Sequence, residues 1–137
     1  MKNDQVVGIG EALWDMLPEG RKIGGAPANF AYHMSQFGFE ATAVSAVGRD
    51  PLGDGLVTEL DSRGLHHALA RVEYPTGTVE VTLDAQGIPC YDIRTEVAWD
   101  HIPFTAGLQQ LAARTRCICF GSLAQRNPDS RQTIQRF

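Results

Sequence analysis

Two adjacent glycines and the helix that follows them have the features needed to hold a small polar ligand. Gly24 and Gly25 have no Cβ atom, so the backbone there can approach a ligand closely and turn where other residues would clash. Pro27 suits the first turn of a helix, and Asn29 falls in that turn beside its free N–H groups. A glycine pair alone is more often an ordinary turn, because short motifs match by chance.

Asp15 is the second candidate, because it stands inside the apolar segment 13–17, upstream of the glycines. A lone charge in such a segment is unfavourable unless it is hydrogen-bonded. The pattern alone leaves two interpretations equally open. The carboxylate binds a ligand, or the side chain points to solvent or caps a turn.

The elements that must position these residues alternate between strands and helices. Buried strands are predicted over 5–9, 41–47 and 116–120, and helices over 27–37, 52–62, 105–113 and 127–137. A strand, a helix and a strand in succession form a βαβ unit with parallel strands. The predicted fold class is therefore α/β, with a Rossmann-like parallel sheet flanked by helices.

Residues 78–93 show a different pattern, typical of an exposed antiparallel hairpin. Val79, Val81 and Leu83 alternate with polar residues, and a return strand over 89–93 follows a turn. Such a hairpin suits a lid over a binding site. A plain extension of the sheet edge explains the pattern equally well. Tyr91 and Ile93 share one face of the return strand and are the candidates for closing over a ligand.

The composition indicates one globular domain. The 137 residues are 43% hydrophobic, which is enough for one core, and the net charge of −4 gives no reason to expect nucleic acid or an anionic membrane surface. No apolar run reaches the length of a membrane span. The start of the chain lacks the apolar stretch of a signal peptide, which predicts a cytoplasmic protein.

The cysteines and histidines do not predict a metal site. Cys117 and Cys119 lie in an apolar run, and no other Cys or His stands at a zinc-like spacing, so we expect buried strand cysteines. His66 and His67 are expected in a solvated turn. The sequence has neither the dinucleotide-binding glycine fingerprint nor a GxxxxGK[ST] phosphate loop.

The glycine segment also belongs to a longer pattern. It resembles the N-terminal signature of the ribokinase-like carbohydrate kinases, the phosphofructokinase-B type, over essentially the whole chain. Gly-Arg-Asp-Pro-Leu-Gly at 48–53 is typical of that family, and segments 8–15 and 120–124 are similar to its fructokinase-like branch. The fixed positions of the signature are all matched, at Gly24, Gly25, Pro27, Asn29, Ala31, Gly38 and Gly48.

The resemblance implies a fold and a function. Residues 1–137 would be the N-terminal part of a single ribokinase-like domain, with lid segments at about 12–24 and 72–95. The activity would be ATP-dependent phosphorylation of a sugar hydroxyl, with ATP and Mg²⁺ as cofactors and a sugar as partner. The positions that would line the sugar site are Asp15, Gly24, Gly25 and Asn29. Lid-to-lid dimers occur in the family, so a homodimer through the lid strands is one expected assembly.

The same resemblance places the catalytic base and the nucleotide site outside this chain. In the family, the base lies in a Gly-Ala-Gly-Asp motif of the C-terminal half, and no such motif occurs before Phe137. We therefore expect this chain alone to be inactive as a kinase. A non-catalytic sugar- or nucleoside-binding regulatory protein, or an interaction remnant that pairs through its lid strands, remains an alternative. The sequence does not identify the sugar.

Overall fold

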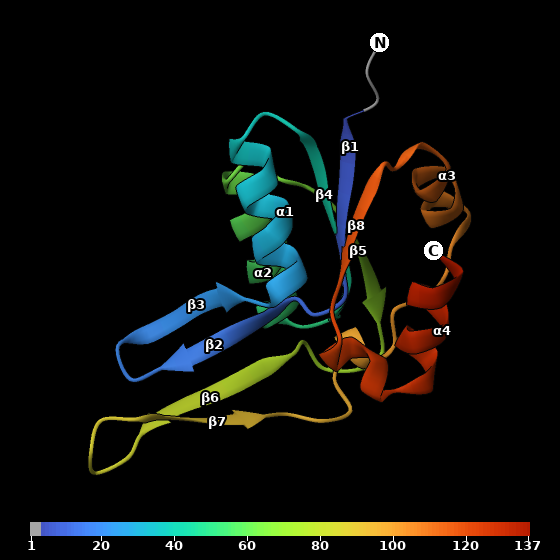
Figure 1. Cartoon of the computed structure of the whole chain (residues 1–137). Coiled ribbons are helices and arrows are strands. Elements are labelled where there is room, and N and C mark those ends of the chain that lie inside the picture. Colours follow the sequence, from blue (N-terminus) through green and yellow to red (C-terminus); the bar gives the residue numbers. More distant parts are fainter. Residues whose placement is uncertain (1–3) are drawn as a thin grey trace.

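Two β-sheets organise the computed structural model, which describes residues 4–137 (Figure 1). The first three residues of the predicted 1–137 domain lie outside the described residues. The larger sheet is entirely parallel, with strand order β5-β4-β1-β8. Its strands are β1 (Gln5–Ile9), β4 (Glu40–Gly48), β5 (His66–Val72) and β8 (Cys117–Phe120).

Helices cover both faces of this parallel sheet, as Figure 1 shows, with α1 and α2 on one face and α3 and α4 on the other. The predicted α/β class is therefore confirmed. The helices are α1 (Ala26–Gln36), α2 (Pro51–Ser62), α3 (Ala106–Arg114) and α4 (Pro128–Arg136).

The second sheet projects from the body of the molecule (Figure 1). Its strand order is β3-β2-β6-β7, and it consists of two antiparallel hairpins joined by a parallel β2–β6 pair. Its strands are β2 (Leu13–Leu17), β3 (Gly20–Gly24), β6 (Thr78–Leu83) and β7 (Pro89–Ile93).

Small residues let α1 pack directly on the central strand of the parallel sheet. A Cβ atom at Gly8 of β1 would overlap the carbonyl of Pro27 in the first turn of α1. Ala28 and Ala31 are buried on the same helix, whereas Phe37, which follows its last residue, is 78% exposed. The helix approaches the sheet closely at these small residues, and its larger side chains Phe30, Tyr32 and Met34 pack against the same core from partly buried positions.

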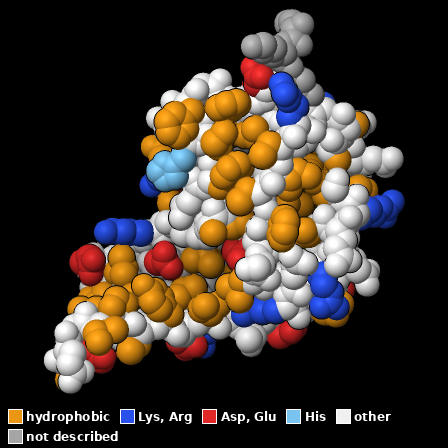
Figure 2. Space-filling model, viewed as in Figure 1, with side chains coloured by type: hydrophobic (Ala, Val, Ile, Leu, Met, Phe, Trp, Pro, Cys, Tyr) orange, Lys and Arg blue, Asp and Glu red, His pale blue; other side chains and the backbone are white. Residues whose placement is uncertain are grey.

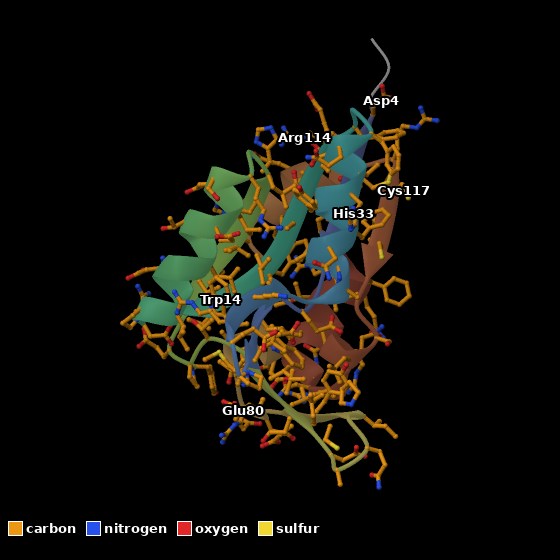
Figure 3. The ribbon with its side chains drawn as sticks, turned by 90° about the vertical axis from the view of Figure 1, so that its left-hand side faces the viewer. Asp4, Trp14, His33, Glu80, Arg114 and Cys117 are labelled. Carbon is orange, nitrogen blue, oxygen red and sulfur yellow. The ribbon has the colours of Figure 1, made fainter. Side chains whose placement is uncertain are left out.

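Two predictions about the parallel sheet are wrong. His66 and His67 are not in a solvated turn, because they begin β5, which pairs with β4 at one edge of the sheet. Cys117 and Cys119 are not buried, because β8 is the opposite edge strand. Cys117 is exposed, Cys119 is partly exposed, and Figure 3 shows Cys117 at the margin of the molecule.

Two short 3₁₀ helices, η1 (Ala98–Asp100) and η2 (Leu123–Arg126), share a hydrophobic cluster with residues of the second sheet. Trp99 of η1 is almost completely buried against Leu13, Val79 and Val81 of the second sheet. Over residues 4–137, none of the helices is both long and apolar enough to cross a membrane. The same residues contain no group of His, Cys, Asp and Glu side chains arranged to hold a metal ion.

Candidate functional site

Asp15 and Gly24 lie against each other in the β2–β3 hairpin. Leu13 pairs with Gly24 and Asp15 pairs with Lys22 in this antiparallel ladder. A Cβ atom at Gly24 would lie only 2.5 Å from Oδ2 of Asp15 and 3.0 Å from Cδ1 of Leu13. The space beside the carboxylate therefore exists because residue 24 has no side chain.

The Asp15 carboxylate is partly removed from water without a compensating partner. Desolvation by burial raises its pKa. Within residues 4–137, no hydrogen bond or ion pair reaches this carboxylate. An ionised group in such a position is unfavourable in the absence of a partner. The arrangement is chemically suited to accept hydrogen bonds from a ligand that carries hydroxyl groups.

Gly25 forms the N-cap of α1 and continues the corner that Gly24 begins. Its φ of 104° lies in the left-handed region that favours glycine, and a Cβ atom there would overlap the carbonyl of Glu11. No side chain caps this helix, and its first turn contains no acidic residue. The helix start therefore presents uncapped N–H groups and positive potential.

Asn29 lies one turn into α1, where its backbone N–H donates to the carbonyl of Gly25 at 3.0 Å. Its exposed side chain lines a hollow of about 410 Å³ together with residues of β3 and α2. Figure 3 looks onto this face, with Trp14 near the base of α2 and His33 on α1. Asn29 thus lies beside the glycine corner, and its amide faces an open space.

Ile93 and Tyr91 are farther from the glycine corner than the other predicted residues. Asp15 pairs with Val79, and Val79 pairs with Ile93, so Ile93 lies in the same row as Asp15 but two strands away, roughly 10 Å. Residues paired across strands share a face, which places Ile93 on the face of Asp15. Tyr91 lies on that face too, in the row of Val81, and is 64% exposed.

Glu11 is a notable residue that the sequence predictions did not include. It lies two residues after the end of β1, is 6% exposed, and its Oε2 atom has no hydrogen-bond partner. Desolvation raises its pKa, although the backbone N–H groups of Ala124 and Leu123 and the charge of Arg126 act in the opposite direction. A Cβ atom at Gly121 would overlap its carboxylate. Its signal in the sequence is a lone charge between Gly10 and Ala12.

Asp50, in contrast, holds a loop through partners within the protein. Its carboxylate accepts hydrogen bonds from the N–H of Gly53 at 2.7 Å, and from the N–H and hydroxyl of Thr76 at 2.9 and 2.6 Å. Desolvation acts to raise the pKa of Asp50, but these hydrogen bonds and the charge of Arg71 outweigh it, so the pKa is lowered. Asp50 therefore fixes the segment that leads into β6.

Arg126 also serves the scaffold rather than an open site. Its guanidinium binds Asp100 through two contacts, Nε to Oδ1 at 2.8 Å and Nη2 to Oδ2 at 2.9 Å. It lies over the ring of Trp99 at 4.1 Å and donates to the carbonyl of Arg94 at 2.6 Å. This cluster connects the end of β7 to η1 and η2.

Comparison with known proteins identifies relatives of the whole described region. A sequence model described as pfkB family carbohydrate kinase matches residues 19–99. A 6-phosphofructokinase of Thermoanaerobacterium thermosaccharolyticum is 30% identical, over 98% of this chain and 45% of that protein. A fructokinase of Salmonella typhimurium is 33% identical, over 81% of this chain and 38% of that protein.

An uncharacterized sugar kinase of Pyrococcus horikoshii is similar in both sequence and structure. Its sequence is 30% identical over 96% of this chain and 46% of that protein. Its crystal structure superposes with a TM-score of 0.85 at 28% identity, covering 96% of this chain and 47% of the other, and it has also been solved in complex with ATP. The chain thus spans less than half the length of these three relatives.

Proposed function

The chain belongs to the pfkB family of carbohydrate kinases. We propose that it supplies the sugar-binding part of an ATP-dependent kinase. That kinase would phosphorylate a sugar hydroxyl, as a fructokinase does. The observation that carries this proposal is the Asp15 carboxylate, desolvated, unpartnered and lying against the bare backbone of Gly24. In this proposal, residues 1–137 are part of one ribokinase-like domain.

The chemistry of a sugar fits this corner. A sugar offers several hydroxyl donors, and one carboxylate accepts two hydrogen bonds at once. Gly24 and Gly25 allow the sugar to approach the backbone, and Asn29 adds an amide that can donate and accept. The proposed contacts would replace the water that burial has removed from Asp15.

The second sheet would act as the lid, formed by segments at about 12–24 and 72–95. Asp15, Val79 and Ile93 lie in one row of this sheet, so closing it over a sugar would bring Asp15 and the apolar side chains Ile93 and Tyr91 to the same ligand. Excluding water matters in a kinase, because water competes with the sugar hydroxyl for the phosphoryl group.

The phosphoryl transfer itself needs groups that these residues do not supply. In-line transfer needs a nucleotide site, Mg²⁺ to neutralise the phosphate charge, and a base beside the attacking hydroxyl. We assign these parts to the other half of the family fold, and we assign to this chain the binding and orientation of the sugar. The P. horikoshii sugar kinase in complex with ATP supports ATP as the phosphoryl donor.

Titration of the chain with fructose tests the role of Asp15. Replacing Asp15 with Ala removes a charged acceptor, and we expect the affinity to fall about tenfold to a hundredfold. Asp92→Ala is a matched control, because Asp92 lies on β7 of the same sheet but alternates with Tyr91 and Ile93 onto the other face. Equal affinity of the wild type and Asp15→Ala would refute the proposed role.

A coupled assay with ATP, Mg²⁺ and fructose tests whether this chain binds the sugar but does not transfer the phosphoryl group. We expect no sugar phosphate to form with this polypeptide alone, because it contributes no base beside the hydroxyl. Measurable turnover by the purified chain would show that the complete catalytic machinery lies within these residues.

Pairing through the second sheet is a second candidate function, favoured by its apolar surface. Leu83, Ile88 and Tyr91 are 62%, 59% and 64% exposed, and Figure 2 shows hydrophobic side chains spread along the projecting sheet. Exposed apolar patches and strand edges favour association with another chain. We expect the apparent mass on gel filtration to rise with concentration. A constant monomeric mass would contradict this function.

A further inference from the structure

His101 lies where the base of the β6–β7 hairpin meets the body of the molecule. It follows η1 directly, and its side chain is only 10% exposed. The next residue, Ile102, is fixed to α4, because its N–H donates to Ser130 Oγ at 2.9 Å and its carbonyl accepts from Thr133 at 2.6 Å. The backbone beside His101 is therefore held against α4, whereas the hairpin projects away from the body (Figure 1).

The ring of His101 faces a carboxylate at each of its two nitrogen atoms. Nδ1 lies 2.7 Å from Oδ2 of Asp129, in the first turn of α4. Nε2 lies 3.5 Å from Oε2 of Glu96, in the segment between β7 and η1. Nε2 is buried, and within residues 4–137 it has no hydrogen-bond partner. A neutral ring that donates from Nδ1 to Asp129 directs a lone pair, not a proton, toward Glu96.

Both connections of the β6–β7 hairpin contact this ring. Tyr74, in the connection between β5 and β6, stacks on it with ring centroids 3.5 Å apart and an angle of 11° between the planes. Glu96, in the connection after β7, has a φ of 53°, and among residues 4–137 it is the only residue other than glycine with a positive φ. Such a backbone conformation is unfavourable and persists where surrounding contacts hold it. The contact with His101 is one that Glu96 makes through its charge.

Glu96 and Asp129 are the charged groups that pair with His101 within residues 4–137. Other charged side chains on the surrounding elements contact other groups or solvent: Asp100 with Arg126, Glu73 with Arg49, Arg131 with the carbonyl of Gln125, Arg136 over the ring of Phe104 at 4.2 Å, and Arg94, which is exposed. The ring therefore has two acidic neighbours and one aromatic neighbour, from three separate segments.

We propose that His101 holds the base of the β6–β7 hairpin against α4 in a pH-dependent way. When the ring carries two protons, both nitrogen atoms can donate, Nδ1 to Asp129 and Nε2 to Glu96, and the positive ring attracts both carboxylates. When the ring carries one proton, it no longer attracts Glu96, and the hairpin is held less firmly. This inference does not depend on the ligand that the chain binds, because it concerns only how the hairpin is attached.

The pH range of this effect follows from the ordinary titration of the side-chain types. A histidine in a model peptide gains its second proton near about pH 6.5, and carboxylates lose their charge below about pH 4. The attraction between His101 and Glu96 is therefore present at about pH 6, and is lost as pH rises through the range in which histidine titrates. It is lost again in acid, when the carboxylates are protonated.

Hydrogen–deuterium exchange of the full chain, read on the backbone amides of residues 78–93, tests this proposal. The quantity compared is the protection factor, which corrects for the pH dependence of the chemical exchange rate. We expect the protection factors to be about twofold to fivefold higher at about pH 6 than at about pH 8.5. The expected change is modest because Glu96 is 70% exposed, and exposed ion pairs are weak.

Variants connect the pH dependence to this contact. In Glu96→Gln, an amide of nearly the same shape can donate to the neutral ring but is not attracted by the charged one, so the protection factors should differ little between the two pH values. His67→Gln is the matched control. His67 also pairs with an aspartate, Asp61 at 2.9 Å, but it lies in β5, outside the second sheet, so this variant should keep the full ratio.

Two results would overturn the proposal. Equal protection of the wild-type hairpin at both pH values would show that protonation does not change how the hairpin is attached. The same ratio in the wild type and in Glu96→Gln would assign the pH dependence to another group. Neither result bears on the sugar site, which the titration of Asp15→Ala tests separately.

Discussion

Two pairs of acidic side chains in this protein have opposite environments. Asp50 and Asp100 are surrounded by donors from the protein itself, namely backbone N–H groups, Thr76 and Arg126. Asp15 and Glu11 are also withdrawn from water, but Asp15 has no partner and one oxygen of Glu11 has none. The first pair lies where loops join the body, and the second lies near the glycine corner.

The difference separates groups that stabilise the fold from groups that await a ligand. A carboxylate with internal donors fixes the segments that carry those donors, and Asp50 and Asp100 fix the two ends of the β6–β7 hairpin. A desolvated carboxylate without donors gives the fold no comparable benefit. A bound ligand that donates hydrogen bonds to such a carboxylate would account for its position.

Asp100→Ala should have the largest effect on stability. The substitution leaves Arg126 without its bidentate partner over the buried Trp99, and we expect the free energy of unfolding to fall by about 3 kcal/mol. Urea denaturation measures the change. Asp92→Ala, on the exposed strand β7, should stay within about 0.5 kcal/mol of the wild type. If both variants lost the same free energy of unfolding, Asp100 would not be one of the carboxylates that stabilise the fold.

Asp50→Ala should be next, with a loss of about 2 kcal/mol at neutral pH from three broken hydrogen bonds. The lowered pKa of Asp50 also fixes the direction of its pH dependence. Its contribution is present above the pKa of the unfolded state, and is lost as pH falls through the lower pKa of the folded state. Unfolding curves from pH 7 into the acid range should therefore converge for wild type and variant, and a constant difference would contradict this account.

Asp15→Asn should have the smallest effect, and of the opposite sign. Burial raises the pKa of Asp15, so its charged form is disfavoured in the folded state. This penalty is absent below the unfolded pKa, and develops as pH rises through the unfolded and then the folded pKa. We expect the variant to be as stable as the wild type at pH 7, or more stable by about 0.5 kcal/mol. If the free energy of unfolding fell by more than about 1 kcal/mol, Asp15 would stabilise the fold as Asp50 and Asp100 do.

Much of the fold could be predicted because local signals agree with the final structure. β1 has the predicted bounds, β2 coincides with the apolar segment 13–17, Thr105 and Asn127 cap α3 and α4 through their side chains, and Gly38 has a positive φ just after α1. These features depend on residues close in the chain. The same holds for the contact of Asp15 with Gly24, since one hairpin brings them together.

The errors arise where an element's position in the sheet decides its environment. Cys117–Phe120 has the composition of a buried strand, but it lies at the edge of the sheet, and Phe120 is 56% exposed. His66 and His67 carry no strong strand signal, and their pairing with Thr42 and Ala43 makes them part of β5. Strand order is set by contacts between distant segments, which a local pattern does not contain.

The sequence by itself determined the family, the α/β class and the glycine corner with its aspartate, because each depends on residue types at short, fixed spacings. Only the tertiary structure decided which acidic groups lack partners, and that Glu11 is one of them. The physical reason is that burial and charge balance depend on every neighbour a side chain has in space, and most of those neighbours are distant in the chain.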